Sequence, residues 1–175
     1  MGSWGVGIFS NDAAADIRED FRDLIAEGLS ADEATRRLHD EYGIGPGGVD
    51  DNDFWLGLAS AQHRLGHVGD GVIERALQII DDPAELERWS PKDQTRRRAV
   101  LAKLQAQLQA PAAEPKKVRP RKKVDTSLEA GEHVLFDAGS RVLLLRVTGV
   151  TSDKGGRYAS AIEVDWDGSE RQLKK

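Results

Sequence analysis

The chain has 175 residues, a formal net charge of −5 at pH 7 and no cysteine. Its length suits one domain or two small ones, and the lack of cysteine excludes disulfides, thiolate metal sites and cysteine nucleophiles. Its apolar runs are far too short to span a membrane, and no charged region followed by an apolar stretch marks a secretory signal. We therefore expect a cytoplasmic protein.

The opening segment, residues 1–12, is the most specific pattern in the chain. Glycines alternate there with large apolar residues, and two residues suited to capping a helix follow. Glycine permits positive φ or close backbone approach, and the aromatic rings offer large apolar area. We expect Trp4 and Phe9 to be buried against helices; the alternative is a functional surface lip. The candidate residues of this motif are Trp4, Gly5, Gly7, Phe9, Asn11 and Asp12.

Five helices are expected over residues 1–109. Apolar spacing predicts the first over residues 12–27, with Ile17, Phe21, Leu24 and Ile25 on one face. Ser30 and Glu33 form a capping-box pattern that opens the second helix, which Gly43 ends.

Turn and capping residues delimit the other three helices. Asp51 or Asn52 caps the third helix, and Asp70 caps the fourth, which breaks at Asp82-Pro83. Ser90-Pro91 opens the last helix, which runs to about Gln109. The short connections predict a bundle of helical hairpins; a helical-repeat solenoid is an alternative that no fixed period supports.

A β region is expected after the helices. Residues 110–126 contain three prolines and six basic residues, a composition typical of an extended linker. Runs rich in β-branched and aliphatic residues then predict strands over residues 132–137 and 141–150, and Ile162, Val164 and Trp166 on one face predict a third strand over residues 158–166. The predicted fold is therefore α+β: a helical bundle over 1–109, a linker over 110–126 and a small antiparallel SH3-like domain over 127–175. A sheet this small buries little by itself, so we expect it to lean on the helices.

The opening residues resemble the start of a bacterial family of unknown function, the DUF4259-type proteins. Every fixed position of their Met-Gly-x-Trp-Gly-x-Gly-x-Phe-x-Asn-Asp pattern is filled. The resemblance extends over most of the chain, through the segments 30–35, 54–62 and 86–89, a β segment around Gly131 and the pair Asp165-Trp166. It implies no reaction, substrate or cofactor.

The patterns that would indicate catalysis or metal binding are incomplete. His63 and His67 have the spacing of a zinc-binding helix, but Arg64 replaces the glutamate of that motif and Gly66 ends the helix between them. We interpret them as solvated histidines at a helix end. The aspartates at 50–53 lack the glycine and glutamate of a calcium loop. No carboxylate pair converges on a pocket, so we expect no metal, no cofactor and no catalytic residues.

Charge is unevenly distributed along the chain. Residues 1–109 hold 12 Lys/Arg and 20 Asp/Glu, while residues 110–124 hold six and one. The candidate contacts for phosphate groups are Arg96, Arg97, Arg98, Lys116, Lys117, Arg119, Arg121, Lys122 and Lys123. Aromatic residues for base stacking are absent from the linker.

We expect the protein to bind another macromolecule without catalysis. The first hypothesis is a protein–protein interaction module, and an acidic protein of this kind also suits an immunity-like role against a basic partner. The alternative is a nucleic-acid-associated protein that uses the basic linker and the small β domain. An enzyme with an unrecognised site is the third hypothesis, and no membrane partner is expected.

Overall fold

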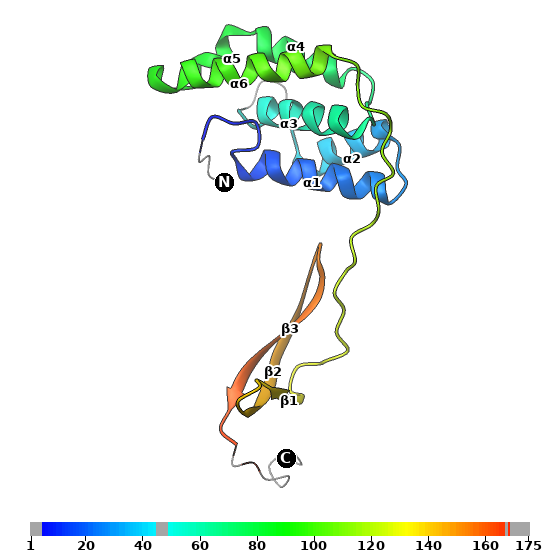
Figure 1. The fold of residues 1–175 in the computed structure, drawn as a ribbon, viewed down its shortest axis with the longest axis vertical. Helices are drawn as coiled ribbons and strands as arrows, with labels where there is room; N and C mark the ends of the chain where they lie inside the picture. Colours follow the sequence, from blue (N-terminus) through cyan, green and yellow to red (C-terminus); the bar gives the residue numbers. More distant parts are fainter. Residues whose placement is uncertain (1–4, 45–48, 167, 169–175) are drawn as a thin grey trace. The chain divides into compact units, whose positions relative to one another are not determined.

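The computed structural model describes residues 5–44, 49–166 and 168, and the chain forms two compact units, residues 1–120 and 121–175 (Figure 1). Six helices lie in the described part of the first unit, and three strands lie in that of the second. The α+β class predicted from the sequence is confirmed. Within the described residues, no helix is both long and apolar enough to cross a membrane.

Three helices of the first unit begin at capping residues that the sequence marks. Asn11 accepts a hydrogen bond from the Ala14 amide at 2.7 Å, and the predicted capping box of Ser30 and Glu33 is confirmed. Ser90 caps the last helix. The helices are α1 (Asp12–Ala26), α2 (Ala31–Tyr42), α3 (Val49–Leu65), α4 (Val72–Asp81), α5 (Pro83–Glu87) and α6 (Pro91–Gln109).

Three local expectations differ from the structure. Five helices are expected, and the sixth is the short helix α5, which follows the predicted break at Asp82-Pro83 because Asp82 accepts a hydrogen bond from the Ala84 amide and Pro83 suits the first helical position. Asp51 and Asn52 do not cap α3, since that helix begins at Val49 and includes both. Asp70 makes no cap either, because Gly71 occupies the N-cap position of α4.

Helix α3 is the centre of the first unit and packs against α1, α4 and α6 (Figure 1). Gly57 of α3 lies so close to α1 that a Cβ there would be 3.3 Å from the Ala14 side chain. The predicted inward residues of α1 are confirmed as core: Ile17, Phe21, Leu24 and Ile25. The core also contains Ala34 and Leu38 of α2 and Leu101, Leu104 and Leu108 of α6.

Residues 110–119 pack on the first unit, where the sequence predicts a linker. The amides of Ala113 and Lys116 donate to the carbonyls of His63 and Leu65 at the end of α3, at 3.4 and 2.9 Å. Val118 packs against the apolar core. The boundary between the units therefore falls after Pro120.

The second unit is a three-stranded antiparallel sheet in the order β1-β2-β3, with β1 (His133–Asp137), β2 (Val142–Asp153) and β3 (Gly156–Val164). The register shifts between Val147 and Gly149, and an isolated bridge joins Val124 to Gly156. Gly156 has a φ of +128°, and a Cβ there would clash with the Val124 backbone. Over the described residues of this unit the sheet is open, so the antiparallel part of the prediction is confirmed and an SH3-like barrel is not.

We call residues 110–119 the docked segment. Their packing on the helices can be tested by hydrogen exchange of the full chain. The amides of Ala113 and Lys116 are hydrogen-bonded to α3, so they should exchange at least about tenfold more slowly than those of Lys122 and Lys123, after correction for intrinsic rates. Equal corrected rates throughout residues 110–123 would show that the segment is an undocked linker.

Candidate functional site

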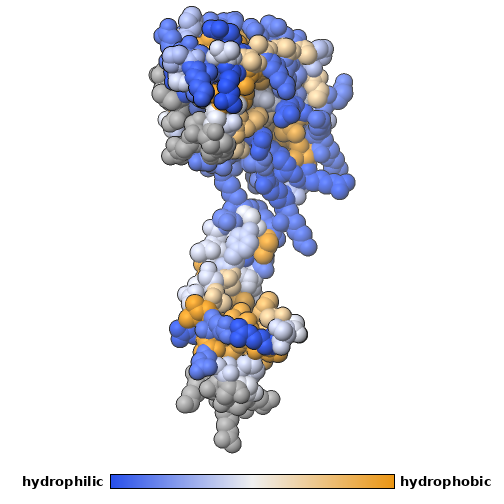
Figure 2. Space-filling view, turned by 60° about the vertical axis from the view of Figure 1, so that its left-hand side comes forward, coloured by the Kyte–Doolittle hydropathy of each residue, from blue (hydrophilic) through white to orange (hydrophobic). Residues whose placement is uncertain are grey.

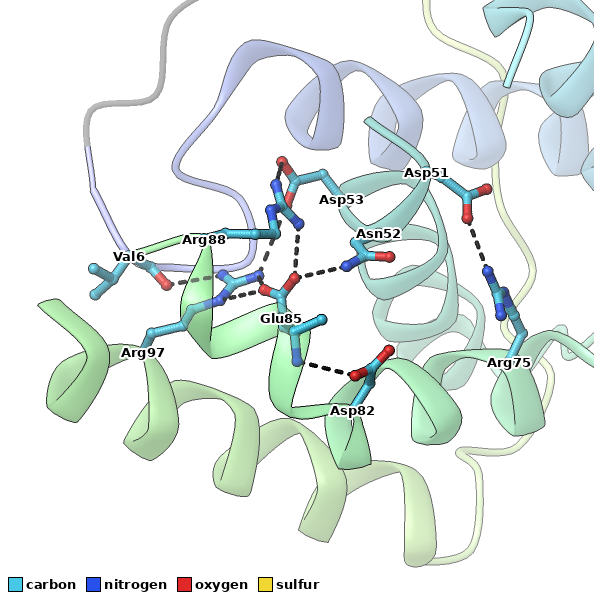
Figure 3. Close-up of polar contacts among 10 residues, drawn as sticks. Val6, Asp51, Asn52, Asp53, Arg75, Asp82, Glu85, Arg88 and Arg97 are labelled. Atoms are coloured by element: carbon cyan, nitrogen blue, oxygen red, sulfur yellow. Dashed lines mark hydrogen bonds and ion pairs between the residues drawn. The ribbon is translucent and has the colours of Figure 1, made fainter. Parts of the chain in front are cut away.

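A cluster of charged side chains is buried where α3, α5 and α6 meet (Figure 3). Glu85 and Arg97 are 0% and 1% exposed, and Nη2 of Arg97 lies 2.6 Å from Oε1 of Glu85. Nε of Arg97 donates to the same oxygen at 3.0 Å. The other oxygen accepts from Asn52 at 2.8 Å and from Arg88 at 2.7 Å. These four hydrogen bonds offset the cost of removing the Glu85 charge from water.

Arg97 also holds the N-terminal segment against the helices. Its Nη1 donates to the Val6 carbonyl at 3.0 Å (Figure 3). Its guanidinium also lies over the Trp89 ring, 4.8 Å from the ring centroid. Asp53 of α3 completes the cluster, 3.5 Å from Arg88 and 3.7 Å from Arg97. With Glu85 and Asp53 ionised, their two negative charges balance those of the two arginines.

The two carboxyl groups of the cluster have opposite pKa shifts. Burial alone would raise the pKa of Glu85, but the charge of Arg97 and the hydrogen bonds from Asn52 and Arg97 lower it below its ordinary value. Burial raises the pKa of Asp53, and Arg88 and Arg97 oppose this only in part. Both carboxylates are paired with guanidinium groups. We therefore interpret the cluster as a structural tether that joins α3, α5, α6 and the N-terminal segment, rather than as a site of acid–base chemistry.

The N-terminal motif is partly in contact with the helical unit. The Ser10 amide donates to the Gly7 carbonyl at 3.1 Å, and a Cβ at Gly7 would lie 2.6 Å from Ser10 Oγ. Gly5 and Gly7 both lack positive φ, and a Cβ at Gly7 would require a shift of the Ser10 hydroxyl. Phe9 is only half-buried, with Arg18 at 4.8 Å from its ring, which corrects the expectation of a buried side chain. Asp12 is exposed in the first turn of α1, and Trp4 lies outside the described residues.

The candidate basic contacts are not all on the surface. Arg97 is wrong as a surface contact, because its guanidinium is buried with Glu85. It follows the inward spacing of Leu101 and Leu104 along α6, a signal that could have identified it. Lys116 Nζ donates to the Arg64 carbonyl at 2.7 Å. The other candidates are exposed: Arg96, Arg98, Lys117, Arg119, Arg121, Lys122 and Lys123.

The two histidines fasten the docked segment to the end of α3. Nε2 of His63 lies 2.9 Å from the Ala110 carbonyl, and Nε2 of His67 lies 2.9 Å from the Lys116 carbonyl. A carbonyl only accepts hydrogen bonds, so each Nε2 carries a proton. His63 is buried, which corrects its interpretation as a solvated histidine. Within the described ranges, no group of three or more His, Asp or Glu residues could hold a metal ion.

A pocket of about 240 Å³ lies beside this segment, between α1 and the end of α3. Sequence reasoning missed it, because its lining comes from three separate parts of the chain. Four of the lining residues are cationic and two are apolar; the full lining is Arg18, Glu19, Arg22, Ala61, Arg64, Leu65 and Lys116.

The sheet of the second unit exposes large apolar side chains. Leu135, Val142 and Ile162 are 48–49% exposed. The strand register places all three on one face, since Leu135 pairs with Leu144 and Ile162 with Arg146, two residues further along β2. Tyr158 lies on this face as well, and Phe136 is 52% exposed on the other. In Figure 2, hydrophobic residues gather on the surface of this unit.

Comparisons with protein-family models, curated proteins and solved structures find no match. The resemblance to the DUF4259-type family stays a prediction.

Replacing Arg97 should test the tether. Arg97→Met leaves the Glu85 charge buried without its main partner, and it should lower the free energy of unfolding by about 3 to 5 kcal/mol. Arg96→Met is the matched control, because the Arg96 side chain is 69% exposed; it should change this free energy by less than about 0.5 kcal/mol. Urea unfolding measures both. Equal effects of the two substitutions would contradict a buried tether.

The pKa of Asp53 gives a prediction with a definite sign. Because this pKa is raised in the folded state, ionisation of Asp53 destabilises the fold as the pH rises through it. Asp53→Asn stays neutral, so its stability relative to the native chain should improve as the pH rises from about 3 through the ordinary pKa of an aspartate and beyond it. Urea unfolding across this range measures the difference. A relative stability that falls with rising pH would refute the assignment.

Proposed function

We propose that the chain is a non-enzymatic, cytoplasmic protein-binding module whose partner docks on the open sheet of the second unit. The observation that carries this proposal is the half-exposed apolar face formed by Leu135, Val142 and Ile162. Contiguous apolar surface costs free energy in water and marks interaction sites in folded proteins. In the described part of the chain, the outer edge of β1 also has no strand beside it, which suits pairing with a partner strand.

The charge of the first unit supports a basic protein as the partner. Residues 1–120 contain 21 Asp/Glu and 15 Lys/Arg, a net charge of −6. An acidic surface attracts a basic protein and accelerates the encounter. The proposal therefore includes an immunity-like role, in which the chain binds and neutralises a basic protein.

Nucleic-acid association is the second candidate function. It is favoured by the exposed side chains of Lys117, Arg119, Lys122 and Lys123 near the boundary between the units. Two observations weaken it: the guanidinium of Arg97 is buried, and Lys116 is bound to the Arg64 carbonyl. The remaining cations make a short basic segment on an acidic chain.

The docking face can be tested with two lysine substitutions on the same strand. Ile162 lies on the apolar face, and its neighbour Ala161 is exposed on the opposite face. A protein captured from host extract by the full chain and then purified should bind Ile162→Lys at least about tenfold more weakly than the native chain. It should bind Ala161→Lys with native affinity, as measured by calorimetry. Native affinity for Ile162→Lys would contradict docking on this face.

Nucleic-acid binding is tested by its salt dependence. The full chain should retain no DNA or RNA on a filter at about 150 mM salt, because the acidic first unit opposes association. Micromolar affinity at this salt concentration would favour the alternative function if it disappeared when the six basic residues of 116–123 became glutamine. A log–log salt slope of about −3 to −5 would then match contacts with four to six phosphates.

A further inference from the structure

The pocket beside α1 concentrates positive charge on an acidic unit. Arg18 and Arg22 lie one turn apart on α1, and Arg64 and Lys116 approach from the end of α3 and the docked segment. Glu19 is the one carboxylate among the residues that line it. The lining therefore carries a net charge of +3 in a unit whose net charge is −6.

Protein contacts orient three of these four cations. Nε of Arg18 donates to Glu19 at 3.0 Å, and its guanidinium lies over the Phe9 ring. Arg22 donates to Asp23 at 2.8 Å and to the Arg119 carbonyl at 3.1 Å. Nζ of Lys116 donates to the Arg64 carbonyl. A guanidinium has five N–H donors and an ammonium three, so each of these groups has further donors for a ligand.

The floor of the pocket is apolar. Ala61 is 3% exposed, and Leu65 packs partly buried against the core. Cations around an apolar floor suit a ligand with an anionic group at one end and an apolar body at the other. The volume of about 240 Å³ limits that body to roughly one small ring or a short aliphatic chain.

We propose that this pocket binds a small phosphate monoester. A phosphate monoester carries about −1.5 to −2 charges at neutral pH, which matches a net lining charge of +3 better than a monocarboxylate does. Arginine forks bind its oxygens through paired N–H donors, and the apolar body lies against Ala61 and Leu65. The site does not depend on the proposed protein partner, because all of its residues belong to the first unit.

Lys116 makes the site dependent on the docked segment. His67 holds the Lys116 carbonyl, while the Lys116 amide is bound to Leu65. Both contacts fix the backbone from which the ammonium group projects. A ligand held by Lys116 and by the arginines of α1 would therefore join this segment more firmly to the helices.

The test uses the full chain and phenyl phosphate in about 150 mM salt, a concentration that screens unspecific surface attraction. Titration followed by amide NMR shifts should show saturable binding, with shifts at Ala61, Leu65 and Lys116. Phenyl phosphate should bind more tightly than inorganic phosphate, because only the ester contacts the apolar floor. Phenol, which lacks the phosphate, should cause no saturable shift at these residues.

Two variants locate the site. Arg18→Gln with Arg64→Gln should weaken phenyl phosphate binding at least about tenfold, since hydrogen bonds to charged groups are among the stronger ones. Arg37→Gln removes an exposed cation of α2 outside the pocket and should leave the affinity unchanged. Amide spectra of each variant check that the fold is retained.

Three results would overturn the proposal. The site is refuted if no saturation occurs up to about 10 mM phenyl phosphate. Equal affinity for inorganic phosphate would refute the role of the apolar floor and hence the ester assignment. An equal loss of affinity in the Arg37→Gln variant would refute the location.

Discussion

The buried ion pair between Glu85 and Arg97 is the interaction on which the first unit depends. It joins α5 to α6, and through Asn52 and Arg88 it reaches the start of α3. Two buried charges are costly unless their hydrogen bonds are complete, so these residues must all be in place together. The cluster therefore fixes how the C-terminal helices of the unit meet α3.

The same cluster gives a structural role to the segment that opens the chain. Arg97 donates to the Val6 carbonyl, and Asn11 then caps α1. Two of the residues that make the opening pattern conspicuous, Gly7 and Asn11, form a tight turn and a cap. The acidic and basic groups of this cluster form ion pairs with one another. The apolar face of the sheet and the cationic pocket are instead accessible to partners.

Local features of the fold could be predicted from the sequence. The apolar faces of α1 and α6 follow from spacing, and the capping box of α2 follows from Ser30 and Glu33. The three strands follow from runs of β-branched and aliphatic residues bounded by turn residues. These features depend on residues a few positions apart, so they can be predicted from periodicity and from capping residues.

Features that depend on distant residues could not be predicted in the same way. The run Arg96–Arg98 suggests a basic surface, and only the pairing of Arg97 with Glu85 in space shows that one of its members is buried. The contact between His63 and Ala110 joins residues 47 positions apart, so local composition predicts a linker where the structure has a packed segment. The pocket combines residues from positions 18 to 116, and no spacing rule brings these together.

A double-mutant cycle on Glu85 and Arg97 tests the central claim most directly. The cycle compares Glu85→Leu, Arg97→Met and the double variant by urea unfolding of the full chain. Each single substitution leaves a buried charge without its closest partner, whereas the double variant removes both charges. The account predicts that the double variant is more stable than the sum of the single effects implies, by about 1 to 3 kcal/mol. Single effects that simply add, within about 0.5 kcal/mol, would contradict the claim that this pair holds the unit together.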